Sequence, residues 1–256
     1  VSYLITKAGS MVPDYSQSVM NHDGSIIAVD TNKTGFNGSF EKKVLKVFKH
    51  DGTQYLEQTF TGDADSSTTV PEDAFLDYGI PSIRSTLIYD MRINPSGDTL
   101  AICYKSRPNT GGITRSYTQR IYKFKEDTNR WHLNKTFNTY EHTNIHINNS
   151  GNIVALSHSS NPNDQTPSYV YDVSNAESNP FGLVEVFQSG DSSADWNRIF
   201  VGSGKTLYQG YGDRIAMNGS GNLLAVASRG IPGAEVDTAW PSGSRLDVYD
   251  ISSLVD

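Results

Sequence analysis

The sequence predicts an all-β fold, and three observations lead to that prediction. A motif with one spacing occurs four times: an Asn, a Gly three residues later, and an Ala four residues after that. The residues before the Asn alternate as in a strand, and the run after the Gly is continuously apolar, as in a strand covered on both faces. Long amphipathic helical patterns are absent. Since repeated copies must form the same structural unit, each copy is predicted to be a β-hairpin.

The predicted turns lie at residues 21–24, 94–97, 148–151 and 218–221. Asn favours tight turns, and Gly adopts the positive φ that other residues resist. The repeated Ala, at positions 28, 101, 155 and 225, indicates where neighbouring sheets approach too closely for a larger side chain.

Further strands rich in Tyr, Phe and Val follow each hairpin. A third strand is predicted at 44–48, 121–124, 169–173 and 246–249, and a fourth at 55–60, 131–137 and 183–187. Four antiparallel strands per unit are typical of a propeller blade, so the sequence predicts a four-bladed β-propeller. The outer strand of the third blade has two candidates, 183–187 and 196–201.

The last blade lacks a fourth strand of its own, and residues 2–7 have the pattern to supply it. We therefore expect residues 1–256 to form a single domain whose ring is closed by the N-terminal strand, which removes two exposed sheet edges. The expected blades cover about 9–61, 85–138, 142–201 and 211–256, the last one together with strand 2–7. The alternative is a fragment of a larger propeller, or an assembly closed by partner chains.

Composition excludes several classes of function. The formal net charge of −7 argues against a nucleic-acid partner, which needs a basic surface. No apolar run approaches the roughly 20 residues that span a bilayer, so no membrane insertion is expected. The single Cys103 forms no intrachain disulfide and is expected to be buried and inert. Val1 starts neither a signal peptide nor a methionine-initiated chain, so processing, cleavage or an incomplete sequence is expected.

The segment from Gly212 to Val226, followed by residues 246–249, resembles FG-GAP-like propeller repeats. Such repeats occur in integrin-α-like ectodomains and in many bacterial, algal and viral surface or virion proteins. The resemblance implies a propeller with a virion or extracellular location. Many members of this family carry an Asp-x-Asp-x-Asp-Gly calcium loop. The turns of this chain depart from it and hold too few carboxylates for the ligand set that calcium prefers, so no structural calcium is expected there.

Long connections are predicted on one propeller face, opposite the short turns, and loops of this length are usually functional. Tyr, Trp and Arg often anchor interfaces or stack on sugars. Trp240 is the leading candidate of a predicted ligand-binding set that consists of Phe36, Tyr104, Arg107, Arg115, Asp237, Trp240 and Arg245. No catalytic residue, metal ligand or cofactor is predicted. His142 and His146 would lie about 13 Å apart on one strand face, without a third ligand, which argues against a shared metal.

Three functions compete. The favoured one is a non-enzymatic structural or adhesion module of a virion or surface, such as a phage tail, fibre or capsid decoration, with other virion or surface proteins, a host glycan or a second copy as partners. The second is a secreted lectin-like or protein-binding propeller. The third, a propeller glycosidase or lyase, needs carboxylates at the central channel. Either of two sets would line that channel, Ser18, Met91, Ile145 and Ile215, or Val19, Arg92, His146 and Ala216, and neither contains one.

Overall fold

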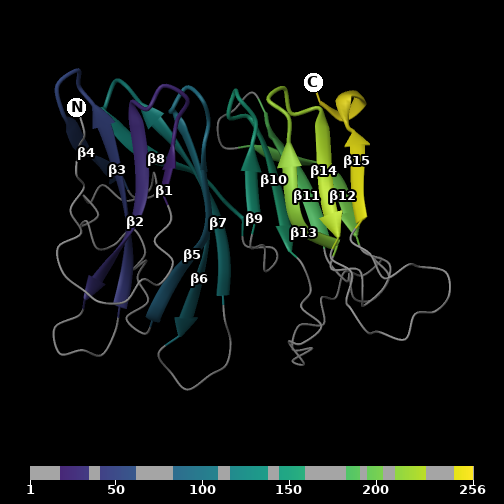
Figure 1. Ribbon diagram of the computed structural model, residues 1–256, viewed down its shortest axis with the longest axis horizontal. Coiled ribbons are helices and arrows are strands. Elements are labelled where there is room, and N and C mark those ends of the chain that lie inside the picture. The colour runs from purple at the N-terminus through teal and green to yellow at the C-terminus, as the bar shows by residue number, and fades with distance from the viewer. Residues whose placement is uncertain are drawn as a thin grey trace.

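The structure is a computed structural model that describes residues 18–34, 41–61, 83–108, 116–137, 144–158, 183–190, 195–203, 211–228 and 245–255. Within these ranges the regular elements are β-strands and one short 3-10 turn, η2 (Ser252–Leu254). The strands form four successive antiparallel units arranged in a row (Figure 1), and we call these units blades 1 to 4. None of the helical segments in the described residues is long and apolar enough to cross a membrane.

Each blade is built from consecutive strands, in agreement with the predicted antiparallel repeat unit. Blade 1 contains β1 (Ser18–Met20), β2 (Ile26–Thr34), β3 (Glu41–His50) and β4 (Tyr55–Thr61). Blade 2 contains β5 (Ile83–Ile93), β6 (Thr99–Pro108), β7 (Ser116–Lys125) and β8 (Arg130–Phe137). Blade 3 contains β9 (Asn144–Ile147), β10 (Ile153–His158), β11 (Leu183–Ser189) and β12 (Trp196–Ser203). Blade 4 contains β13 (Tyr211–Met217), β14 (Leu223–Ser228) and β15 (Arg245–Asp250).

The structure resolves the ambiguity in the third blade. Residues 183–189 are its third strand, and residues 196–203 are its outer strand, paired with β11 from Leu183↔Ser203 to Ser189↔Trp196. The segment 169–173, expected as the third strand, lies outside the described residues. So does strand 2–7, and blade 4 has three strands within the described ranges.

Blades 1 and 2 are joined in a way that the sequence does not predict. The outer strands β4 and β8 pair in parallel, with Phe60 opposite Trp131, so the two blades form one eight-stranded sheet. The rings of Phe60 and Trp131 are stacked, with centroids 6.3 Å apart and an interplanar angle of 30°. The outer strands of blades 1 and 2 are thus joined both by backbone hydrogen bonds and by this ring contact.

Three hydrophobic cores lie between the successive blades. The core between blades 1 and 2 includes Ala28, Val47, Met91, Leu100 and Trp131. The core between blades 2 and 3 includes Ala101, Cys103, Phe137, Ile145 and Leu156. The core between blades 3 and 4 includes Ala155, Val186, Tyr211, Met217 and Leu224.

Alternate residues of the second strands therefore enter different cores. Leu100 packs toward blade 1 and Ala101 toward blade 3, and both are fully buried. This two-sided burial explains why the run after each turn Gly is continuously apolar. Cys103 lies in the second core, and burial raises the pKa of its thiol well above the usual range, as expected for an inert cysteine.

The Asn of each repeat closes its turn through its side chain. Asn94 Oδ1 accepts from the backbone N–H groups of Asp98 (3.1 Å) and Thr99 (2.9 Å). Its Nδ2 donates to Ser96 Oγ and Asp98 Oδ1, both at 2.8 Å. Asn148 and Asn218 make the same contacts to the serine two residues on and the asparagine four residues on. The oxygens at those two positions thus converge on an amide nitrogen.

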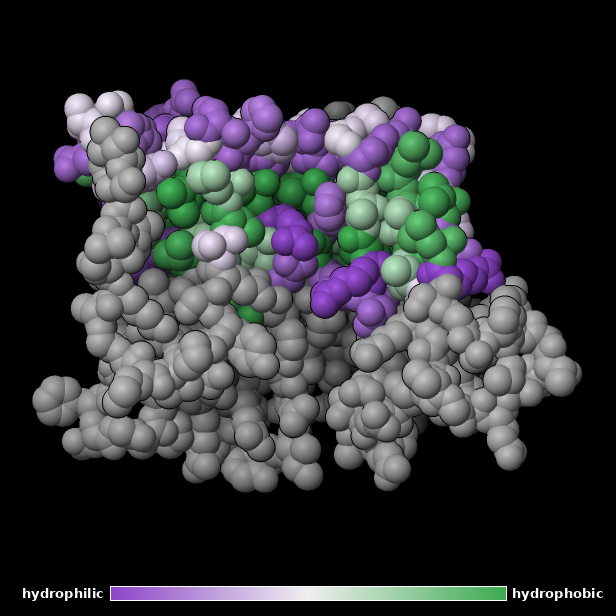
Figure 2. All heavy atoms as spheres, in the orientation of Figure 1, coloured by the Kyte–Doolittle hydropathy of each residue, from purple (hydrophilic) through white to green (hydrophobic). Residues whose placement is uncertain are grey.

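Neighbouring turns are hydrogen-bonded to one another through the position after the Asn. His22 N donates to Pro95 O (3.3 Å), and Asn149 N donates to Gly219 O (2.9 Å). Pro95 has no N–H, and the link from blade 2 to blade 3 runs instead from Asn94 Nδ2 to Asn149 O (3.3 Å). The repeat turns form a linked, polar edge of the molecule, and apolar side chains lie in a band below it (Figure 2).

In blades 2, 3 and 4 the turn Gly lies against the preceding blade. Gly97 has a φ of +78°, and a Cβ there would lie 2.7 Å from both Asn21 Nδ2 and Ile26 Cγ1. At 2.7 Å one of these side chains would have to shift, so the position favours Gly for two reasons, conformation and space. Gly151 and Gly221 occupy the equivalent places in the next two interfaces.

Candidate functional site

Three of the seven predicted ligand-binding residues lie within the described ranges, and all three are on strands. Phe36, Arg115, Asp237 and Trp240 lie outside the described residues. Tyr104 and Arg107 lie in β6, opposite Ile88 and Ser85 of β5. Arg245 begins β15, is exposed, and forms an ion pair with Asp247, with 2.6 Å between Nη2 and Oδ1. The ion pair with Asp247, on the same strand, therefore helps to hold the Arg245 side chain in place.

The inner strands β1, β5, β9 and β13 pack against one another in succession. Of the two sets expected to line a channel, the first is wrong in blades 2 and 3. Met91 and Ile145 are buried in the cores between blades, with exposures of 0% and 1%. Arg92 and His146, one residue further along, belong to the opposite face of their strands.

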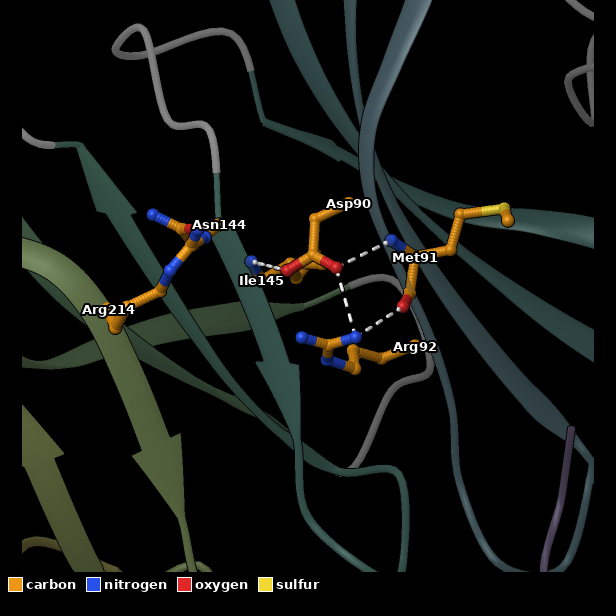
Figure 3. A network of polar contacts seen from close by, with 6 residues as sticks. All are labelled: Asp90, Met91, Arg92, Asn144, Ile145 and Arg214. Atoms are coloured by element: carbon orange, nitrogen blue, oxygen red, sulfur yellow. Dashed lines mark hydrogen bonds and ion pairs between the residues drawn. The ribbon is translucent and has the colours of Figure 1, made fainter. Parts of the chain in front are cut away.

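A carboxylate lies on the same face as Arg92, two residues before it. Asp90 is 9% exposed, and its Oδ2 accepts the backbone N–H of Ile145 on β9 at 3.1 Å (Figure 3). Its Oδ1 accepts the N–H of Met91 at 3.0 Å and lies 3.0 Å from Arg92 Nη1. Both oxygens are therefore engaged, and the contact to Ile145 joins blade 2 to blade 3.

Burial raises the pKa of Asp90, whereas the Arg92 guanidinium, the two backbone N–H groups and the more distant Arg214 act in the opposite direction. The increase means that desolvation is the largest effect, even with an adjacent guanidinium. Burial also lowers the pKa of His146 on β9, and the Arg92 charge lowers it further.

A second set of contacts joins blade 3 to blade 4 at the same level (Figure 3). Asn144 Oδ1 accepts from Arg214 Nη1 at 2.9 Å, and Asn144 Nδ2 donates to the carbonyl oxygen of Asp213 at 3.2 Å. Ser157 Oγ donates to Gly212 O at 2.8 Å. We call Asp90, Arg92, Asn144, His146 and Arg214 the inner-strand cluster.

Two β-bulges position this cluster. The register of β5 with β6 shifts between Ile88 and Asp90, and that of β13 with β14 shifts between Tyr211 and Arg214. A bulge adds a residue to one strand and re-aims the side chains that follow it. In β13 the bulge residues are Gly212 and Asp213, whose carbonyl groups receive the bonds from blade 3.

Sequence reasoning missed Asp90, Asn144 and Arg214. These three residues share one offset, four positions before the repeat Asn of their blades. Extending the repeat alignment back to that offset would have shown three polar residues in register on neighbouring inner strands. The described residues contain no group of three His, Cys, Asp or Glu side chains that could hold a metal ion. His142, one of the two histidines considered above, lies outside them.

No family model matches the sequence, and no curated protein matches it. Solved structures similar to the chain include tricorn protease, with a TM-score of 0.49 at 10% identity over 92% of this chain and 21% of that one. Another is the β-propeller domain of the Trilobed protease from Pyrococcus furiosus (TM-score 0.43, 9% identity), with 91% of this chain and 54% of that chain covered. A third is the β-propeller domain of Myceliophteria thermophila Cps50 (Swd1) (TM-score 0.41, 7% identity), with 92% and 70% covered.

The chain thus spans about a fifth and about a half of the first two of these proteins. The assignment to a propeller type of fold rests on the chain's own features: successive antiparallel blades, inner strands in contact, and one core in each interface between blades.

Proposed function

We propose that the chain is a non-enzymatic structural or adhesion module of a virion or cell surface, such as a phage tail, fibre or capsid decoration. Its partners would be other virion or surface proteins or a host glycan, bound at the edge opposite the repeat turns. The observation that carries the proposal is the separation of two edges. The four repeat turns lie at one edge. The connections between the second and third strands of each blade lie at the other, where β2, β6, β10 and β14 end and β3, β7, β11 and β15 begin (Figure 1).

The hydrogen bonds that Asp90 accepts support a non-enzymatic role. A general base needs a carboxylate oxygen that can reach a substrate proton, and both oxygens of Asp90 accept donors from the protein. Binding through connections on a rigid β scaffold requires no such group.

We further propose that the chain forms one domain, a closed four-bladed ring in which strand 2–7 completes blade 4. Among the described strands no pairing joins blade 1 to blade 4, and these two blades stand at opposite ends of the row (Figure 1). Support comes from Leu223, the first residue of β14, which is 41% exposed, whereas its repeat equivalents Ile26 and Ile153 are buried under the turn Gly of the following blade. In a closed ring blade 1 follows blade 4, so its turn residue Gly24 would cover Leu223 in the same way.

In a closed ring, blades 1 and 4 would meet in an interface that we call the seam. The blade 1 side of the seam also supports closure. Met20 is 59% exposed, whereas its equivalents Ile147 and Met217 are buried against the preceding blade. On the blade 4 side, Leu246 (66%) and Val248 (63%) are also exposed, and apolar side chains reach the surface over β14 and β15 (Figure 2). Two uncovered apolar faces at the ends of a repeat array are suited to cover each other.

The variant Leu223→Lys tests the ring. In a closed ring it places an ammonium group in an apolar seam, and we expect the free energy of unfolding to fall by about 2 kcal/mol or more. The matched control is Val201→Lys, because Val201 is 50% exposed on β12, outside the seam, and should change stability by less than about 0.5 kcal/mol. Equal small effects would refute the closed ring. Sedimentation of the wild type distinguishes a closed monomer from copies joined end to end.

The functional part is tested on the native material. We expect mass spectrometry of the intact source particle to find the chain in fixed stoichiometry with other virion or surface proteins. A free, secreted monomer would contradict this proposal and favour the lectin-like or protein-binding propeller. A glycan array then measures binding by the wild type and by Trp240→Ala, with Leu254→Ala as the control, because Leu254 lies at the turn edge after β15.

A further inference from the structure

The inner-strand cluster contains more hydrogen-bond donors than acceptors. Among the described residues, Arg92 makes contacts through Nη1 alone, to the carbonyl of Met91 (3.1 Å) and to Asp90. Arg214 likewise directs only Nη1, to Asn144. A guanidinium has five N–H donors, so both groups keep Nε and Nη2 donors without a partner among the described residues.

His146 adds a further unsatisfied group to the same surface. Its Nδ1 is buried and has no hydrogen-bond partner among the described residues. The ring lies on β9, between the strands that carry Arg92 and Arg214, and the Arg92 charge is close enough to affect its titration. A buried ring nitrogen without a partner costs free energy unless a ligand or water pairs with it.

The acceptors of the cluster are already occupied. Asp90 accepts three donors, and Asn144 Oδ1 accepts Arg214. Among the members of the cluster, one carboxylate stands against two guanidinium groups, so the cluster itself carries positive charge in a chain whose formal net charge is −7. An external group that carries negative charge and several acceptor oxygens would complement these donors.

We propose that the inner-strand cluster binds one small oxyanion, a phosphate or a carboxylate, through the free donors of Arg92 and Arg214, with the ring of His146 beside it. Guanidinium groups suit this ligand because their planar fork matches the spacing of carboxylate and phosphate oxygens. Asp90 and Asn144 act as positioning residues, since each holds the Nη1 atom of one arginine and leaves the remaining donors for the anion. The site depends on β5, β9 and β13 alone, so it does not require the ring to be closed.

The test is an NMR titration of the full chain with inorganic phosphate and, separately, with acetate, at constant ionic strength set by sodium chloride. The His146 ring signals are assigned with His146→Gln. We expect a saturable shift of these signals with at least one anion and an increase in the His146 pKa, because a bound anion favours the protonated ring. Saturation with phosphate alone, or with acetate alone, identifies which group the site takes.

The variants Arg92→Gln and Arg214→Gln should each weaken the saturable binding about tenfold or more. Arg130→Gln is the matched control, because Arg130 is an exposed arginine of β8, outside the cluster, and its removal should leave binding unchanged. Circular dichroism checks the fold of each variant, and Arg214→Gln remains informative if Arg92→Gln fails to fold. A linear shift equal to that in chloride, or unchanged binding in both folded variants, would overturn the proposal.

Discussion

The carboxylate of Asp90 accepts the backbone N–H of Ile145 at 3.1 Å, across the interface between blades 2 and 3. A backbone amide at the start of β9 therefore finds its partner in a side chain of β5. Because the two groups lie on different blades, this bond contributes to blade packing as well as to the local conformation of β9.

We predict that Asp90→Asn lowers the free energy of unfolding by roughly 1–3 kcal/mol. An amide offers one acceptor oxygen in place of two, so the N–H of Met91 or of Ile145 is left facing an NH2 group. Urea unfolding at neutral pH measures the change. Asp127→Asn is the control, since Asp127 is exposed in the β7–β8 turn and accepts one exposed N–H. A loss as small as that of the control would mean that the Asp90 contacts contribute nothing.

The repeat asparagines differ in burial, and this difference makes a second prediction. Asn148 is 2% exposed and Asn218 is half-buried, although in both the side-chain oxygen accepts the backbone N–H five residues on. We expect Asn148→Ala to cost about 2–4 kcal/mol, because buried N–H groups of the turn lose their acceptor. Asn218→Ala should cost less, since water can replace the lost contacts. Denaturant unfolding of the pair tests this, and a larger loss for Asn218 would instead indicate that its turn is covered in solution.

A comparison of two glycines with positive φ distinguishes the cost of backbone strain from the cost of a steric clash. Gly97 and Gly52 have φ values of +78° and +103°, but only Gly97 has neighbours where a Cβ would lie. Gly52→Ala should cost about 1–2 kcal/mol from conformation alone. Gly97→Ala should cost roughly 1–3 kcal/mol more, because Asn21 and Ile26 must move. Similar losses in thermal unfolding would show that the interface yields easily.

The β3–β4 turn predicts a specific pH dependence. Asp51 Oδ1 accepts Gln54 N, Thr53 N and Thr53 Oγ1, and these bonds lower the pKa of Asp51 to about 2. Since the native pKa lies below the unfolded value near 3.8, the contribution to stability is present above pH 3.8 and is lost as pH falls toward 2. Asp51→Asn should therefore flatten the stability profile between pH 4 and pH 2, measured by urea unfolding. An unchanged slope would contradict the role of these bonds.

Repeated features of this fold could be predicted from the sequence, and unique ones could not. The Asn–Gly turns and the two-sided strands such as residues 99–103 follow from local patterns that recur four times. The parallel pairing of Phe60 with Trp131 depends on how two outer strands meet in space, and neither strand carries a signal for its partner. In blade 3, residues 183–187 and 196–201 both have strand patterns, and only tertiary pairing determines which is the outer one.

The candidate site was less predictable, for a related reason. Strand alternation correctly separated Met91 from Arg92, but a bulge between Ile88 and Asp90 changes the register where the cluster begins. An aspartate that reads as a solvated strand residue in isolation becomes buried because blade 3 packs over it. The loop residues Phe36 and Trp240 lie outside the described ranges, and their proposed role in binding stays a prediction.

The ladder between β4 and β8 has a consequence for how the molecule comes apart. Strands of the first two blades share one continuous network of backbone bonds, so they cannot separate without breaking that network. Among the described strands, no such ladder joins blade 4 to blade 3. We therefore expect amide hydrogen exchange to divide the chain into cooperative units, with slow exchange shared by β2–β3 and β6–β7. Slow exchange of the β15 amides would then indicate that strand 2–7 pairs with β15 in the closed ring, whereas fast exchange of β15 alone would indicate an open end at blade 4.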